Sequence, residues 1–173
     1  MKATLLIFSV AFLFITSVHA QKEYTVIIDS LHNSQEILKG LITKKDLAEN
    51  SQYAWYAESR KIYPVADRKA VEGMRKNKDN VKLVIFGGTW CEDSHFVLPK
   101  LFKIQEESDF PENRMVIYAV DRNKETLNGM TAIYHITGIP TIIVMKNGRE
   151  VGRVVEFGKT GKWDKEFAEI FSE

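Results

Sequence analysis

Residues 81–94, VKLVIFGGTWCEDS, join an apolar run to the only cysteine of the chain. The run is interrupted only by Lys82, as expected for a strand that is covered on both faces. Gly87 and Gly88 allow a tight turn, and a helical pattern begins near Cys91. This stretch therefore predicts a strand, a turn and a helix, with Cys91 at the N-terminus of that helix.

The position of Cys91 favours a reactive thiol. The free backbone N–H groups and the dipole at a helix N-terminus stabilise the thiolate, which is the nucleophilic form. The Ser94 hydroxyl could donate a hydrogen bond to the sulfur. Glu92 and Asp93 oppose the thiolate by charge, and a protonated His95 could offset them. In the alternative interpretation, the two acids only favour the start of the helix.

Residues 1–20 have the pattern of a secretory signal peptide. Lys2 is followed by the apolar residues 5–15 and by the small-residue site Val18-His19-Ala20, before Gln21. The apolar stretch is shorter than the roughly 20 residues that a membrane span needs. We expect cleavage near Ala20–Gln21 and an exported protein, periplasmic or secreted, with no stable membrane span. An uncleaved anchor is the alternative.

The remaining chain has the length and composition of one domain with a proper core. Its formal net charge is +1, with acids and bases interspersed, so it carries no electrostatic footprint for nucleic acid. A single cysteine cannot form an internal disulfide, so stability must come from packing and redox chemistry must involve a second molecule. We divide the mature chain into an N-terminal extension, residues 21–66, and a main domain, residues 67–173.

The extension is expected to be mostly helical and packed on the main domain. Residues 24–28 are β-prone and suit an edge or first strand. Thr43 begins a capping-box pattern, and the helical segment that follows stops before Pro64. An aromatic cluster is expected to pack this segment onto the main domain: Tyr53, Trp55, Tyr56 and Tyr63. The extension could cover part of the sheet or help to shape a groove.

The main domain alternates between strand and helix patterns. Strands are expected at 81–86, 115–120, 141–145 and 149–156, and helices after Asp67, at 91–107, within 123–135 and at 163–171. Asn147-Gly148 is a strong type I′ turn signal, which makes the last two strands antiparallel. The order predicts an α/β fold, with a central mixed sheet and helices on both faces.

Four landmarks in this order resemble the thioredoxin superfamily. They are Trp90-Cys91-x-x-Ser94, Pro99 in the following helix, the segment from Tyr134 through Ile139-Pro140-Thr141, and Gly158 after the last strand. The resemblance covers residues 67–173 and implies a thioredoxin-like three-layer α/β/α sandwich. It also implies that Pro140 is cis and lies against Cys91. Trp90, Ile139 and Pro140 would then form a groove for an extended substrate.

Two departures from the family pattern limit what the resemblance implies. The second cysteine of the usual motif is Ser94 here, and the buried acid six residues before the first cysteine is Ile85. In the family mechanism, these two groups resolve the mixed disulfide that the first thiolate forms. Their joint absence argues against an autonomous dithiol oxidoreductase.

The resulting hypothesis is an exported protein that exchanges thiols and disulfides through Cys91 alone, with Ser94 beside it. Cys91 would form mixed disulfides with client proteins or small thiols, and an external thiol would release them. The alternative is a redox-inactive module that holds extended peptides in the Trp90/Pro140 groove. No cofactor is expected. A metal site from Cys91 and His95, with Asp93 or His135, lacks enough ligands from spacing alone.

Overall fold

The computed structural model describes residues 23–30, 32–63 and 65–172. The expected signal peptide and its cleavage position lie outside these described residues. The described chain forms a six-stranded mixed sheet in the order β1-β2-β4-β3-β5-β6. β3 and β4 are parallel, and the other neighbouring pairs are antiparallel.

The strands are β1 (Tyr24–Asp29), β2 (Gln35–Ile42), β3 (Val81–Gly87), β4 (Met115–Ala119), β5 (Thr141–Lys146) and β6 (Arg149–Val155). The α-helices are α1 (Lys44–Ala48), α2 (Ala54–Ile62), α3 (Arg68–Asn77), α4 (Glu92–Glu107), α5 (Met130–Ile133) and α6 (Trp163–Ile170). Short 3-10 turns occupy Ser51–Tyr53, Glu112–Arg114 and Leu127–Gly129.

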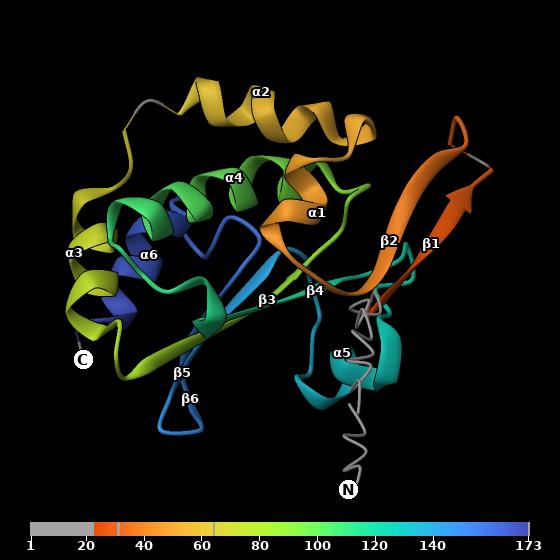
Figure 1. The fold of residues 1–173 in the computed structure, drawn as a ribbon. Helices are drawn as coiled ribbons and strands as arrows, with labels where there is room; N and C mark the ends of the chain where they lie inside the picture. The colour runs from red at the N-terminus through yellow and green to blue at the C-terminus, as the bar shows by residue number, and fades with distance from the viewer. Residues whose placement is uncertain (1–22, 31, 64, 173) are drawn as a thin grey trace, which may run out of the picture.

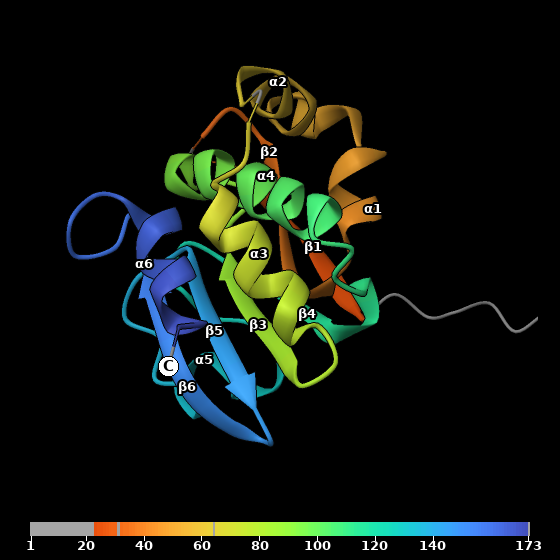
Figure 2. The same cartoon turned by 90° about the vertical axis from the view of Figure 1, so that its left-hand side faces the viewer.

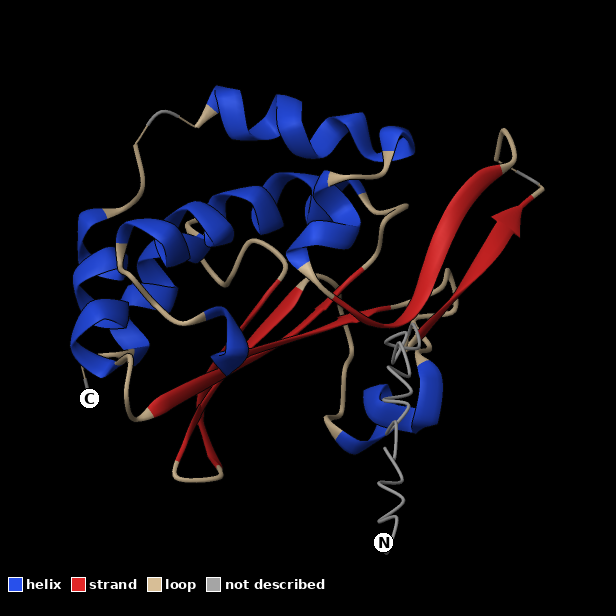
Figure 3. Cartoon of the chain, viewed as in Figure 1, coloured by secondary structure: helices blue, strands red, loops and turns tan. Residues whose placement is uncertain are grey.

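The helices flank the sheet unequally. Figure 1 shows α4, α3 and α6 against one face, with α2 as an outer layer above α4, whereas the small α5 lies on the other face. Figure 2, turned by 90°, shows α3, α4 and α6 in front of the strands. The strands run between these groups of helices in Figure 3. The mixed sheet with flanking helices confirms the predicted fold class.

Strand β3 lies inside the sheet, between β4 and β5, and apolar side chains cover both of its faces. Leu83 and Ile85 are fully buried in the main apolar core beneath α3, α4 and α6. Val84 and Phe86 point to the opposite face, where they belong to a second cluster with Ile139. The alternation of side chains along a strand thus makes every residue from 83 to 86 a core residue, as its apolar run predicts.

The N-terminal extension contributes strands as well as helices. β1 was expected, but β2 was not, and together they form a hairpin whose second strand pairs with β4. Leu38 and Leu47 of the extension are buried in the same core as β3. Tyr53 and Tyr56 are also buried in it, and Trp55 packs against it.

The helix expected within residues 123–135 is only the short α5. Asn128 and Gly129, just before α5, both have positive φ angles of 61° and 64°. Left-handed residues interrupt a right-handed helix, so the helical segment is confined to Met130–Ile133. α5 is therefore a single short turn on this face of the sheet.

The turn at Asn147-Gly148 has the expected geometry. Both residues have positive φ, 53° and 76°, which the type I′ turn requires, and β5 and β6 pair antiparallel around it. Across the described ranges, no helix is long and apolar enough to cross a membrane.

Candidate functional site: a thiol at the N-terminus of helix α4

Cys91 is the N-cap residue of α4 and is partly exposed. Its backbone N–H donates to the Gly88 carbonyl at 3.1 Å, which closes the turn after β3, and its carbonyl accepts from the His95 N–H at 3.0 Å. Its thiol lies 3.7 Å from the Ile139 carbonyl oxygen, to which it donates. The sulfur is therefore at a helix N-terminus and against the Ile139-Pro140 step, as the resemblance implies.

The Ile139-Pro140 peptide bond is cis, and both residues are buried. The Pro140 carbonyl accepts from the Glu156 N–H at 2.7 Å, which ties this step to the end of β6. Thr141 donates its hydroxyl to the Gly138 carbonyl at 2.7 Å. These hydrogen bonds fix the loop before β5, so the wall that faces the thiol is held by two strands.

Trp90 forms the neighbouring wall. Its indole N–H donates to the Val120 carbonyl at 2.9 Å, and its ring packs on the apolar cluster that contains Ile139. A Cβ added at Gly88 would lie 2.8 Å from the Trp90 indole nitrogen. Gly88 is therefore required here because only a residue without a side chain admits the ring.

The structure brings Trp90, Cys91, Ile139 and Pro140 together, but it turns Ser94 inward. Ser94 is fully buried, and its Oγ accepts a hydrogen bond from the Gly88 N–H at 3.1 Å. Within the described chain, no hydrogen bond joins Ser94 to the sulfur, so the expected donation to the thiolate is not observed. The hydroxyl oxygen instead satisfies a buried backbone donor at the end of β3, a role that sequence reasoning missed.

The surroundings of His95 disfavour the positive charge that could have offset Glu92 and Asp93. Its Nε2 lies 2.8 Å from the Thr89 carbonyl, to which it donates, and its ring stacks on Trp55 with centroids 4.0 Å apart. Burial lowers the pKa of His95 below its usual value, and this outweighs the Thr89 hydrogen bond and the Glu92 charge, which raise it. The imidazole is therefore biased towards its neutral form, because burial disfavours the charge.

The extension forms hydrogen bonds with the loop that precedes Cys91. Thr89 is buried, and its Oγ1 accepts from the Leu38 N–H of β2 at 3.2 Å. Gln35 donates its side-chain amide to the Thr89 carbonyl at 3.5 Å. Together with the stacking of Trp55 on His95, these contacts place the extension directly behind Cys91. Of the two roles considered for the extension, shaping the groove is therefore supported as well as covering the sheet.

Arg122 was not predicted as part of the site. Its guanidinium lies over the Trp90 ring, 5.0 Å from the centroid, and pairs with the Asp29 carboxylate. A hydrogen bond with His32, and then the neighbouring Arg122, hold the pKa of Asp29 below its usual value. These residues lie far apart in sequence and share no motif, so only the folded hairpin reveals their proximity.

The other polar residues considered near Cys91 are Glu92, Asp93 and His135. Glu92 is exposed in the first turn of α4, and Asp93 is beside it. His135 is exposed beyond α5. Over the part of the chain that the structure describes, no group of three or more His, Cys, Asp or Glu side chains could hold an ion. Ile85 occupies the position of the family acid and is fully buried among apolar side chains.

Comparisons with known proteins identify the family. A thioredoxin family model matches residues 41–164. Thioredoxin from Staphylococcus epidermidis is 35% identical over 82 residues, which are 47% of this chain and 74% of that protein. Thioredoxin from Echinococcus granulosus is 33% identical over 95 residues, covering 55% and 82% of the two chains.

A solved structure of a Pseudomonas aeruginosa protein of unknown function has a TM-score of 0.50 and 14% identity, and it covers 73% of this chain and 86% of its own. That likeness concerns the fold alone. The family match and the thioredoxin relatives show more: the chain belongs to the thioredoxin family. Membership implies thiol–disulfide redox chemistry and thiol-based contacts with client proteins in general.

Proposed function

We propose that this protein exchanges thiols and disulfides through Cys91 alone. The observation that carries the proposal is the contrast between two positions on α4. Cys91 is partly exposed at the helix N-terminus beside the Ile139 carbonyl, whereas Ser94, one turn further on, is fully buried. The first position can meet a substrate sulfur, and the second offers no thiol to resolve the product.

The proposed reaction is a pair of displacements at sulfur. The Cys91 thiolate attacks one sulfur of a client disulfide, a new bond joins Cys91 to that sulfur, and the other client sulfur leaves as a thiolate. An external thiolate then attacks the client sulfur of the mixed disulfide. This step restores the Cys91 thiolate and leaves the client joined to the external thiol. No net electron transfer occurs in the pair of steps.

The groove suits an extended client segment. The Ile139 N–H has no hydrogen-bond acceptor among the described residues, and it belongs to the residue whose carbonyl contacts the sulfur. An extended peptide could pair with this backbone group, as a strand pairs with a sheet edge. Trp90 would form the apolar wall on the other side of the thiol.

The proposal includes export. Its support is the signal-peptide pattern of residues 1–20. N-terminal sequencing of the mature protein from the producing cells tests this part, and the expected first residue is Gln21. An intact Met1 on the mature chain would contradict cleavage while leaving the chemistry of Cys91 unaffected.

Mass spectrometry of the intact protein tests the chemistry. The reduced full chain is incubated with oxidised glutathione, and one glutathione per chain should be added at Cys91. Cys91→Ala should remain unmodified. A disulfide peptide should give the corresponding peptide adduct at Cys91, and added thiol should remove either adduct.

The outcome that overturns the proposal is also defined. If folded protein binds the reduced peptide but forms no adduct under any of these conditions, and Cys91→Ala binds the peptide equally well, then Cys91 is incidental. The redox-inactive peptide-binding module would then be the correct function.

A further inference from the structure

A cavity lies along β3, towards the end of the strand opposite Cys91. Tyr134, which follows the short α5, packs over this sheet face with its ring 5.6 Å from that of Phe86. Among the described residues, the other end of this face holds this cavity of about 510 Å³. Its lining residues are Asp79, Asn80, Lys82, Val84, Arg114, Val116, Tyr134, Met145, Asn147 and Gly148.

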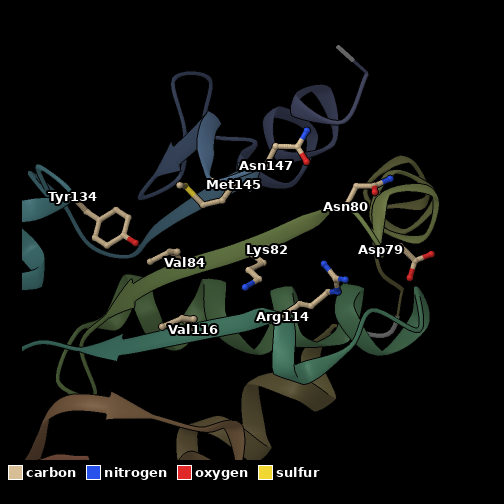
Figure 4. Close-up of a pocket in the computed structure, with 10 residues that line it drawn as sticks. Asp79, Asn80, Lys82, Val84, Arg114, Val116, Tyr134, Met145 and Asn147 are labelled. Carbon is tan, nitrogen blue, oxygen red and sulfur yellow. The ribbon is translucent and has the colours of Figure 1, made fainter.

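The floor of the cavity is apolar at one end. Val84 and Val116 face each other across the β3–β4 pair, and Met145 of β5 adjoins them. Val84 is buried, whereas Val116 and Met145 are only partly buried. Tyr134 closes this end (Figure 4). An apolar ligand group in the cavity would remove the exposed surface of these side chains from water, which is favourable for binding.

Two cations lie beside this apolar floor. Lys82 precedes Val84 by two residues and therefore faces the same side of the sheet. Arg114 precedes β4, and its guanidinium donates to the Val81 carbonyl at 3.4 Å. Figure 4 shows both side chains between the apolar group of Tyr134, Val84, Val116 and Met145 and the polar rim at Asn80 and Asp79.

Neither cation is paired with a carboxylate of the described residues. In residues 23–30, 32–63 and 65–172, no carboxylate forms an ion pair with Lys82 or Arg114. Asp79 lies at the far rim of the cavity, so the lining side chains carry one more positive than negative charge. A ligand carboxylate would therefore supply charged hydrogen-bond acceptors that the protein itself does not provide.

We propose that this cavity binds a small organic carboxylate with an apolar body. The carboxylate would lie at Lys82 and Arg114, and the body would cover Val84, Val116 and Met145. The cavity volume falls within the usual range for small-molecule sites, about 300–1,000 Å³. The proposal does not depend on the thiol chemistry, because Cys91 does not line the cavity, whose lining on β3 ends at Val84, in the middle of the strand.

The probe is sodium decanoate, below its micellar concentration, titrated into the 15N-labelled full chain. Amide shifts should saturate and should be confined to residues around Lys82, Val116 and Met145. Decanol keeps the body without the charge, and acetate keeps the charge without the body. Each should bind at least about tenfold more weakly than decanoate.

A charge-removing pair of variants gives the matched test. Lys82→Gln combined with Arg114→Gln should weaken decanoate binding at least about tenfold. Arg149→Gln removes an exposed cation of β6 outside the cavity and should leave binding unchanged. Unchanged amide shifts elsewhere establish that each variant is folded.

Three results would overturn the proposal. Equal binding of decanol would show that the cations do not select the ligand. Saturable shifts centred on Trp90 and Ile139 would place the probe in the thiol groove instead. Shifts that never saturate would show that the cavity is an open surface without a site.

Discussion

The guanidinium of Arg122 lies over the indole ring of Trp90, 5.0 Å from its centroid. Arg122 is in turn paired with Asp29, at the end of β1. The N-terminal hairpin therefore braces the tryptophan that precedes Cys91. This link couples a strand outside the resemblance to the wall of the thiol groove.

Arg122→Gln should slow the reaction of Cys91 with a disulfide peptide about two- to fivefold, the effect of losing an exposed cation–π contact of about 0.5–1 kcal/mol. Alkylation by iodoacetamide should be nearly unchanged because a small reagent does not need the Trp90 wall. Parallel rate measurements with the two reagents check the prediction. Arg149→Gln is the control, and an equal loss of both rates would contradict a role for Arg122 in the wall.

The free energy of unfolding should decrease as the pH is lowered through the range in which His95 takes up a proton. Burial lowers the pKa of folded His95, so the unfolded chain binds the proton more tightly. The contribution of His95 to stability is therefore fully present above the pKa of histidine in the unfolded chain, about 6.5. This contribution decreases as the pH falls towards the lower pKa of the folded state. Urea unfolding at intervals from about pH 7 to pH 5 should show this loss.

His95→Gln should flatten this part of the pH dependence because the replacement does not titrate. His135→Gln, which changes an exposed histidine, is the matched control. A slope that survives in His95→Gln would assign the effect to another group.

Ser94→Ala should destabilise the protein by about 1–3 kcal/mol, because it leaves the buried Gly88 N–H without its acceptor. Thermal or urea unfolding measures the change. The exposed Ser30→Ala should stay within about 0.5 kcal/mol of the wild type. If both serine variants were equally stable, Ser94 would have no structural role at the end of β3.

Placing the acid of the family at position 85 should destabilise the protein strongly. Ile85→Asp should cost about 3–5 kcal/mol, because it removes core contacts and buries a carboxyl among apolar side chains. Ile85→Val, the volume control, should cost only about 0.5–1.5 kcal/mol. Equilibrium unfolding distinguishes the two. An aspartate variant as stable as the valine variant would mean that water or a polar partner reaches this position.

The sequence predicts the parts of the site that depend on local pattern. The apolar run of β3, the helix after Cys91 and the turn at Asn147-Gly148 all follow from residue type and spacing, and the structure confirms them. The fold class follows from their order. The family resemblance adds the proximity of Pro140 to Cys91, which no local pattern shows.

The parts that depend on tertiary contact could not be predicted. β2 was missed because its polar residues and Gly40 weaken the alternation that marks a strand. The Ser94 side chain is buried where its hydroxyl accepts a hydrogen bond from the Gly88 N–H. The lowered pKa of His95 is caused by its burial. The shortness of α5 had a local signal, Asn128-Gly129, which favours a turn over a helix.

The central claim is that Cys91 captures a partner and needs an external thiol to release it. Its most direct test is the amount of thiol released when the reduced full chain meets excess disulfide peptide. Wild-type protein should release one thiol per chain and stop, whereas Ser94→Cys should go on to form its own disulfide and free the captured half of the peptide. Continued release by the wild type without added thiol, or no release at all, would contradict the claim.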